Sequence, residues 1–388
     1  MAKGKGGFIG QDGLNAPDSP TSVSASGGDT QATVSFTAPS DVGGSAITGY
    51  VATSNDGIGA TGTSSPITVT GLTNGTSYTF SVWAINAFGY SAPSDASGSV
   101  SPVAPLGLIA SSSDNTVMSV SIATTGNASD FGDLNVSAFG TASGSSQTRA
   151  LFGGGRDGVV INNIDYMTFS SAGNATDFGD LTSARRSLGA CSSSTRTLVA
   201  GGVTTGEVTT IDFVTTATTG NATSFGGLTE ARSQIAGLSS PTRGVFAGGT
   251  GDNGITIDYV TIASASNATD FGDLNAATQA PAGASSSTRG LWMGGKVGAS
   301  VINTIQYITI ASTGNATDFG DLTVARSAAG GASSEVRALC AMGNNNVVAL
   351  NVIDYVTIAS TGNATDFGDA TVTSDASGST SNAHGGLQ

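Results

Sequence analysis

Pairs of aspartates separated by two residues are the best candidates in this sequence for the ligands of a cation. A hard cation such as Ca²⁺ takes about six to eight oxygen ligands, so two carboxylates and nearby carbonyl groups would begin such a site. The spacing matches no calcium-binding loop, and aspartate in a tight turn usually accepts hydrogen bonds from backbone N–H groups. The pattern therefore favours turn capping over metal binding, and we predict no metal and no cofactor. The five pairs are Asp130 and Asp133, Asp177 and Asp180, Asp270 and Asp273, Asp318 and Asp321, and Asp366 and Asp369.

Six asparagines followed two residues later by serine or threonine could accept an N-linked glycan. They recur with the aspartates, so one turn copied six times explains them more simply. The N-terminal residues 1–5 lack the apolar segment of a signal peptide, and we expect synthesis in a cytoplasm without export by that route. These asparagines are Asn127, Asn174, Asn221, Asn267, Asn315 and Asn363.

Residues for nucleophilic catalysis are scarce. His384 is the one histidine, expected in a closing strand or a loose tail, and the two cysteines are Cys191 and Cys340. These residues cannot form a Ser-His-Asp set, an H-E-x-x-H helix or a Cys-His cluster. The cysteines are interpreted as buried small apolar residues and not as a disulfide. We therefore predict a protein that is not an enzyme, with a glycosidase that uses two carboxylates as an alternative.

The aspartates belong to the phrase T-G-N-A-T-D-F-G-D-L, which recurs six times at intervals of 46–48 residues. A period in the forties, with short β segments and Gly-rich turns, is typical of a propeller blade. In one unit the expected strands are residues 188–190, 198–200 and 211–214 and the segment around Phe225. A single unit cannot bury its own apolar face, so the units are expected to stack around an axis.

The number of blades follows from the two ends of the repeat region. Residues 106–110 and 118–122 form a degenerate first unit that lacks its leading strand, and residues 373–379 form a leading strand without a unit after it. The sequence therefore predicts a six-bladed β-propeller at residues 104–388. The C-terminal strand is expected to complete the first blade, which leaves no open sheet edge.

The units resemble the kelch repeat, in which a Gly-Gly pair ends one strand and an aromatic residue follows. In this sequence phenylalanine takes the place of the kelch tryptophan, and Met342-Gly343 departs from the glycine pattern. The expected pairs are Gly153-Gly154, Gly201-Gly202, Gly248-Gly249 and Gly294-Gly295, and the aromatic residues are Tyr166, Phe213, Tyr259, Tyr307 and Tyr355.

The N-terminal quarter has a different pattern. Residues 1–14 form a Gly-rich, flexible leader in which Phe8 and Ile9 are candidates for attachment to a partner. Residues 15–103 alternate apolar and polar positions between turn signals, which predicts a seven-stranded β-sandwich. This segment resembles a fibronectin type III domain, in which Phe36 stands at the usual tryptophan position and Leu72 with Tyr78 resembles the tyrosine corner. The fold class expected for the whole chain is all-β.

Composition and charge limit the partners. The chain has 388 residues, a formal net charge of −14 and a pI near 4.1, and its basic residues are scattered. Nucleic-acid binding needs clustered Lys and Arg, so it is not expected. No apolar run approaches the length of about 18 residues that a membrane-spanning helix needs.

Loops that differ between the repeats are the candidate recognition surface, since variable loops on a rigid scaffold commonly bind partners. Trp292 could be a platform for a sugar, but a buried strand aromatic is the favoured interpretation. The candidate ligand-binding residues are Arg156, Asp157, Glu207, Asp252, Asn253, Lys296, Asn344, Asn345 and Asn346.

A fibronectin type III segment joined to a kelch-like propeller resembles virion proteins of tailed bacteriophages, particularly those of marine cyanobacteria. That resemblance implies a virion structural protein assembled in the host cytoplasm in multiple copies, as a tail fibre or adhesin whose propeller contacts a host-envelope glycan or protein. Other virion proteins would hold its N-terminal part. A capsid or tail decoration protein is one alternative and would present a flat face, whereas recognition predicts a concave face with exposed aromatics or amides. A carbohydrate-degrading enzyme is the other alternative, and it would need two carboxylates about 5–10 Å apart in one pocket.

Overall fold

The computed structural model describes residues 15–251 and 254–387, and it divides the chain into two compact units between Ala104 and Pro105. The expected leader at residues 1–14, with Phe8 and Ile9, lies outside the described residues, as do Asp252 and Asn253. Among the described residues every regular element is a strand except one short 3₁₀ helix, η1 (Gly385–Leu387), which confirms the all-β class. None of the described segments forms a helix long and apolar enough to cross a membrane.

The first unit consists of two antiparallel sheets with an apolar core built from both. Tyr50 and Phe36 pack with their ring centroids 4.7 Å apart, and the backbone N–H of Thr73 donates a hydrogen bond of 3.0 Å to the hydroxyl of Tyr78. The expected tyrosine corner is therefore present. One sheet contains β1 (Thr21–Gly28), β2 (Gln31–Thr37) and β5 (Ile67–Thr70); the other contains β4 (Gly59–Gly62), β3 (Gly49–Ser54), β6 (Phe80–Asn86) and β7 (Gly89–Tyr90).

The second unit consists of six four-stranded antiparallel sheets, here numbered sheet 1 to sheet 6 in chain order. Sheet 1 combines β8 (Leu106–Ser111), β9 (Thr116–Ser121) and β10 (Ser129–Asp133) with the C-terminal strand β35 (Ala376–Ser381). Sheet 2 is β11 (Ala142–Ser145), β12 (Arg149–Gly153), β15 (Asn163–Thr168) and β16 (Thr176–Asp180); sheet 3 is β17 (Gly189–Ser192), β18 (Arg196–Ala200), β19 (Thr210–Thr215) and β20 (Thr223–Gly227). Sheet 4 is β21 (Ala236–Ser239), β22 (Arg243–Ala247), β23 (Thr256–Thr261) and β24 (Thr269–Asp273); sheet 5 is β25 (Ala282–Ser285), β26 (Arg289–Met293), β29 (Thr304–Thr309) and β30 (Thr317–Asp321); sheet 6 is β31 (Gly330–Ser333), β32 (Arg337–Ala341), β33 (Val352–Thr357) and β34 (Thr365–Asp369).

Neighbouring sheets bury their apolar faces against each other. Separate core clusters lie between sheets 1 and 2, 2 and 3, 3 and 4, 4 and 5, 5 and 6, and 6 and 1. The innermost strands β11, β17, β21, β25, β31 and β35 follow one another in contact, and β35 also contacts β11. This packing explains why one repeat is not stable alone, since each sheet completes the core of the next.

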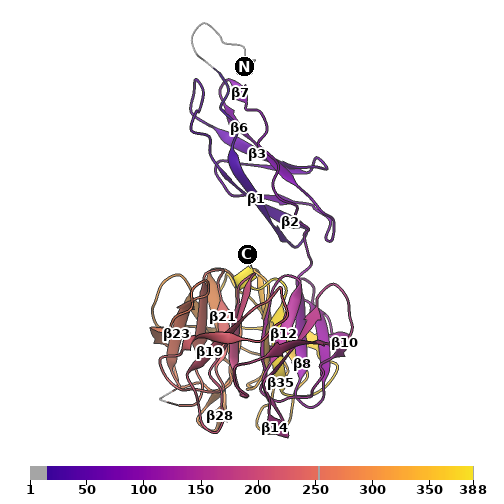
Figure 1. Cartoon of the computed structure of the whole chain (residues 1–388), viewed down its shortest axis with the longest axis vertical. Helices are drawn as coiled ribbons and strands as arrows, with labels where there is room; N and C mark the ends of the chain where they lie inside the picture. Colours follow the sequence, from indigo (N-terminus) through magenta and orange to yellow (C-terminus); the bar gives the residue numbers. More distant parts are fainter. Residues whose placement is uncertain (1–14, 252–253, 388) are drawn as a thin grey trace. The chain divides into compact units, whose positions relative to one another are not determined.

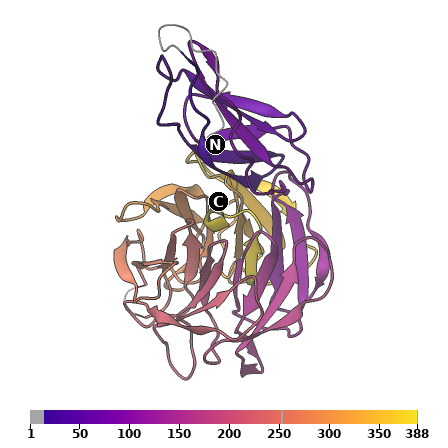
Figure 2. The ribbon, with the colours of Figure 1, turned by 45° about the horizontal axis from the view of Figure 1, so that its top comes forward.

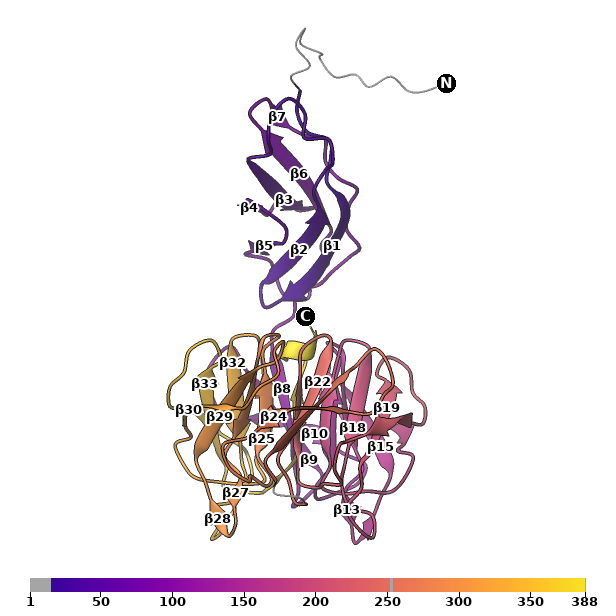
Figure 3. The same cartoon turned by 90° about the vertical axis from the view of Figure 1, so that its left-hand side faces the viewer.

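Two short hairpins extend from one end of the second unit. They are β13 (Arg156–Asp157) with β14 (Val159–Val160), and β27 (Lys296–Val297) with β28 (Ser300–Val301). Figure 1 and Figure 3 show both hairpins at the end away from the yellow helix η1. Figure 2 looks toward the end that holds η1, with the sheets around it. We call these the loop end and the C-terminal end of the second unit.

The prediction that the aspartate pairs cap tight turns was wrong, because the pairs lie in the outermost strands, for example Asp130 and Asp133 in β10. A β-bulge between these residues interrupts the register at Gly132. Gly132 has φ +147°, and a Cβ atom there would come within 2.3 Å of the carbonyl oxygen of Gly173 in the next repeat. The glycine makes the phrase look like a turn, but it is required by the close approach of the neighbouring backbone.

Candidate binding cavity of the second unit

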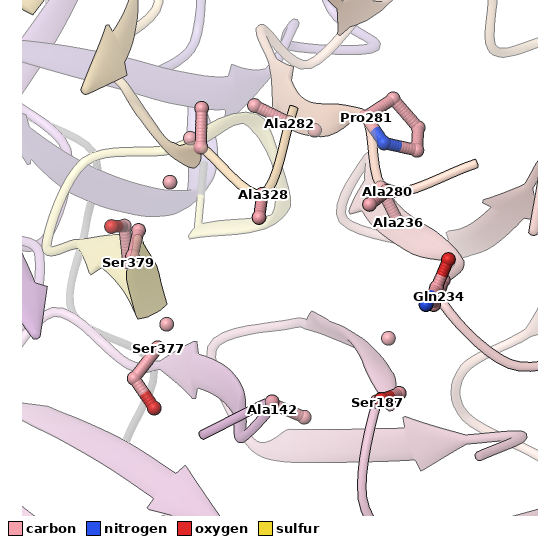
Figure 4. Close-up of a pocket in the computed structure, with 18 of the residues that line it drawn as sticks. Ala142, Ser187, Gln234, Ala236, Ala280, Pro281, Ala282, Ala328, Ser377 and Ser379 are labelled. Carbon is pink, nitrogen blue, oxygen red and sulfur yellow. The ribbon is translucent and has the colours of Figure 1, made fainter. Parts of the chain in front are cut away.

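A cavity of about 280 Å³ lies among the innermost strands toward the loop end of the second unit. Its lining comes from segments of all six sheets and consists mainly of Gly, Ala and Ser (Figure 4). Within the described lining, Lys296 and Asp375 are the charged residues, and Phe139 is the aromatic residue. The cavity is therefore small, nearly neutral in charge and rich in backbone groups.

A left-handed backbone position recurs around this cavity, once in each of the repeats that form sheets 2 to 6. The residues are Gly140, Ser187, Gln234, Ala280 and Ala328, with φ between +49° and +70°. The N–H of each of the last four donates to the carbonyl oxygen of the preceding member, over 2.7–3.1 Å. A side chain in this conformation costs about 1–2 kcal/mol relative to glycine. The hydrogen bonds between repeats hold the conformation, and four of the five positions still carry a side chain.

Two hydroxyl groups in the lining have no hydrogen-bond partner within the described structure. They are the Oγ atoms of Ser187, whose residue is 7% exposed, and of Ser379 in β35. The amide of Gln234 lies at the edge of the same cavity (Figure 4). Asn344 donates from Nδ2 to Oδ1 of Asp375 over 2.7 Å, so this carboxylate already has one partner. The two hydroxyl oxygens are themselves buried, so the amide of Gln234 is a polar side chain that the cavity edge presents directly.

The loop residues proposed from sequence fall into two groups. Lys296 and Asn344 line the cavity. Arg156 and Asp157 are exposed in the β13–β14 hairpin, and Glu207 accepts hydrogen bonds from the hydroxyls of Ser233 and Thr250 in the next repeat. Asn345 shapes its own loop, since its Oδ1 accepts from the N–H groups of Val347 and Val348. Asn346 joins two loops, since its Nδ2 donates to the carbonyl of Ala299 in the β27–β28 hairpin.

Apolar side chains at the tips of these loops are freely exposed. Val159 in the β14 strand is 70% exposed, Val347 is 85% exposed and Val348 is 55% exposed. Phe139 at the cavity is 40% exposed. These side chains form exposed apolar surface around the cavity, which a binding partner could contact.

The C-terminal end is built differently, around six serines from the innermost strands. In the order Ser145, Ser192, Ser239, Ser285, Ser333 and Ser381, the hydroxyl of each serine after the first accepts a hydrogen bond from the backbone N–H of the serine before it. Ser145 Oγ in turn donates to the carbonyl of Ser381 over 2.7 Å. This arrangement narrows the space between the strands to a volume of about 50 Å³.

His384 lies against these serines and is not part of a loose tail. Its Nδ1 accepts from the N–H of Gly386 and its Nε2 lies 3.1 Å from Ser145 Oγ, so Nε2 carries the proton in the neutral ring. Burial of the ring lowers the pKa of His384 to about 4. The residue therefore helps to fix the C-terminal turn as a neutral hydrogen-bonding group.

Three buried ion pairs support the scaffold and were missed by sequence reasoning. Arg185 pairs with Asp212, Arg232 with Asp258 and Arg326 with Asp354, over 2.6–2.8 Å, with fully buried side chains. Burial lowers the pKa of Arg185, an effect that Asp212 opposes. The signal was present, since the arginine and the aspartate recur at fixed positions in the same repeats.

The aromatic residues that recur in the third strand of five repeats also have a structural role. Five arginines stack on them at 4.5–4.9 Å and donate to backbone carbonyls of the following sheet, which joins neighbouring sheets at their surface. Trp292 is 1% exposed, which confirms the interpretation as a buried strand aromatic. Cys191 and Cys340 are buried free thiols, as expected. Among the described residues, no group of three or more metal-binding side chains is present.

Glycine positions agree with the expected pattern with one shift. The equivalent of Gly201-Gly202 in sheet 2 is Gly154-Gly155, one residue later than expected, with φ +67° and +106°. In sheet 6 the corresponding left-handed residue is Met342, with φ +62°.

The comparison with known families concerns the first unit. Residues 18–99 match the fibronectin type III domain. The fibronectin type III domain accounts for the two sheets and the tyrosine corner described above. No curated protein matches the chain.

Proposed function

We propose that the second unit is a six-bladed, kelch-like β-propeller closed by the C-terminal strand. Support comes from the six four-stranded sheets, the packing of sheet 6 against sheet 1, and the antiparallel pairing of β35 with β8. The Gly-Gly positions and the aromatic residue that follows them agree with a kelch-like pattern.

We propose further that the protein is a bacteriophage virion surface component, of the tail-fibre or adhesin kind, whose propeller recognises the host surface. The observation that carries this proposal is the concave loop end, where the amides of Gln234 and Asn344 line a cavity and valines are exposed around it. A concave site with a few placed polar groups is typical of ligand binding. The fibronectin type III domain and the preceding residues would attach to other virion proteins.

The position at which the chain enters the second unit agrees with this division of roles. Leu106 pairs with β9, and its backbone N–H donates a hydrogen bond to Asn382 Oδ1. The chain therefore enters the second unit at the C-terminal end of that unit. The variable loops project from the opposite end (Figure 1). The entry of the chain into the second unit is therefore at the end opposite to its variable loops.

The two alternatives differ in what they require of the loop end. A decoration protein would suit a flat face, whereas this end is hollow. A glycosidase uses two carboxylates in one pocket, and the described lining supplies that of Asp375. We therefore propose binding, and not hydrolysis, as the role of the cavity.

The test uses the fluorescently labelled full chain, incubated separately with candidate cyanobacterial host cells and with phage particles that lack the protein. We expect binding to both, and Val347→Asp at the loop end should weaken binding to cells while binding to particles is retained. Val336→Asp is the matched control, because Val336 is 61% exposed in a turn of sheet 6 that precedes β32 and is not in a loop-end segment. Binding to particles alone would overturn host recognition and support decoration. Loss of particle binding in Val347→Asp would indicate that the loop end faces the virion.

A further inference from the structure

We propose that the cavity binds one neutral sugar residue, presented at the end of a glycan. This inference rests on the proposed recognition function and specifies its ligand class. It is carried by three features of the same cavity: the partnerless hydroxyls of Ser187 and Ser379, the amide of Gln234 at the cavity edge, and a lining that is both small and neutral.

The hydroxyl of Ser187 is the clearest sign of a missing partner. A buried hydroxyl without a hydrogen bond is unfavourable, so rotation of this side chain toward a polar group that enters the cavity would be favourable. The cavity volume of about 280 Å³ corresponds to about nine water molecules. A sugar ring can replace such waters and offer hydroxyl groups in their place, each able to donate and accept.

The amide of Gln234 points to the same conclusion. Of the five left-handed positions around the cavity, this one carries a long amide side chain, whereas the others are Gly140, Ser187, Ala280 and Ala328. The amide lies at the cavity edge, where it can both donate and accept a hydrogen bond (Figure 4).

Size and charge favour a single neutral ring. Pockets for drug-sized ligands have volumes of about 300–1,000 Å³, and this one lies just below that range. Lys296 and Asp375 contribute one charge of each sign, so the described lining does not select an anion or a cation. Ala328 lines the cavity and is only partly buried (Figure 4), so its methyl group can contact the C–H face of a sugar ring.

The experiment is saturation-transfer NMR on the full chain with glucose, galactose, mannose, rhamnose and N-acetylglucosamine, and with glucuronic acid and glucosamine as charged probes. A ligand of this size is expected to bind at millimolar concentration, so each sugar is present at about 10 mM. We expect at least one neutral sugar to bind more tightly than both charged probes.

Two glycine substitutions separate binding from stability. Gln234→Gly should weaken the binding of that sugar about fivefold to tenfold, while the thermal midpoint stays the same or rises because backbone strain is relieved. Ala280→Gly is the matched control: it relieves the same strain in the next repeat, at φ +49°, without removing a polar group. Its sugar binding should stay within about twofold of the unmodified protein. Ser187→Ala should weaken binding without lowering stability, since it removes a hydroxyl that has no partner.

Several results would overturn the inference. They are the absence of binding by every neutral sugar, preference for a charged probe, and equal effects of Gln234→Gly and Ala280→Gly. If cells bind the protein but no sugar does, the sugar inference fails while host recognition stands. If a sugar binds but cells do not, host recognition fails while the cavity remains a sugar site.

Discussion

Removal of the carboxylate from one buried ion pair should destabilise the second unit, and a further substitution should restore stability. In sheet 4, Arg232 Nη2 lies 2.7 Å from Asp258 Oδ2, and Arg232 Nη1 donates to the carbonyls of Gly248 and Thr256. Asp258→Gln leaves the buried guanidinium without an opposite charge. Breaking a buried pair in this way typically costs about 3–5 kcal/mol.

The chain itself supplies the compensating pair. At the equivalent positions of the next repeat stand Thr278 and Gln306, both buried, and Gln306 Oε1 accepts from the N–H of Asn275. The double variant Arg232→Thr, Asp258→Gln reproduces that arrangement without a buried charge. We expect it to cost about 1–3 kcal/mol relative to the unmodified protein, and so to be about 2 kcal/mol more stable than Asp258→Gln alone.

The assay is urea unfolding followed by the fluorescence of Trp292. Trp292 is buried in the cluster between sheets 4 and 5, and its Nε1 lies 3.4 Å from the carbonyl oxygen of Ala236 in sheet 4. Trp83, the other tryptophan, is replaced by Phe in all variants so that the signal reports the second unit. A difference of about 2 kcal/mol corresponds to a midpoint shift on the order of 1 M urea. A double variant that is less stable than Asp258→Gln would refute the reasoning, because the unpaired guanidinium would then not be the source of the loss.

Three further predictions concern other parts of the chain. Tyr78→Phe removes the acceptor for the Thr73 N–H and should cost the fibronectin type III domain about 1–2 kcal/mol, measured by thermal unfolding; a loss below about 0.3 kcal/mol would contradict it. Because burial lowers the pKa of His384 to about 4, below about 6.5 in the unfolded chain, its contribution is complete above pH 6.5 and declines by about 2–3 kcal/mol as the pH falls to about 4. Chemical denaturation across this window should show that decline, and His384→Gln should reduce it. Burial raises the pKa of the Cys191 and Cys340 thiols, so neither should react with a thiol reagent at pH 8 until urea unfolds the second unit.

The sequence predicts the strands of a repeat well, but not the role of every residue in them. Residues 211–214 were expected as a strand and lie in β19, the strand expected around Phe225 is β20, and the C-terminal strand expected at 373–379 is β35, Ala376–Ser381. The aspartates of the phrase were misinterpreted as turn residues because the F-G step breaks the alternation. Only the neighbouring repeat, which comes within 2.3 Å of a Cβ placed at Gly132, explains that glycine.

The cavity was not foreseeable from one repeat, because its residues meet only when the repeats are assembled. Lys296 and Asn344 were proposed from loop variability and do line it, whereas Ser187, Gln234 and Ser379 were not proposed. The position shared by Ser187 and Gln234 varies between repeats at a point that is otherwise regular in sequence. This variation in residue type between otherwise similar repeats was the signal in the sequence that could have indicated a binding position.

The repeats also serve as an alignment of the chain with itself, and the aspartate of the third strand shows how this can be used. In sheet 2, Asp165 is buried and alanine (Ala138) stands at the sequence position of the arginine, while the backbone N–H and Nδ2 of Asn135 donate to the Asp165 carboxylate. Thr229 donates to Asp258 in the same way, from both its N–H and its hydroxyl. These repeats therefore share a side-chain oxygen in the third strand, which accepts a hydrogen bond from a backbone N–H just after the outermost strand of the preceding sheet. Arginine accompanies the aspartate in sheets 3, 4 and 6, whereas Asn135 holds Asp165 in sheet 2 and glutamine supplies a neutral oxygen in sheet 5. The position therefore requires an acceptor oxygen and tolerates it with or without a buried ion pair.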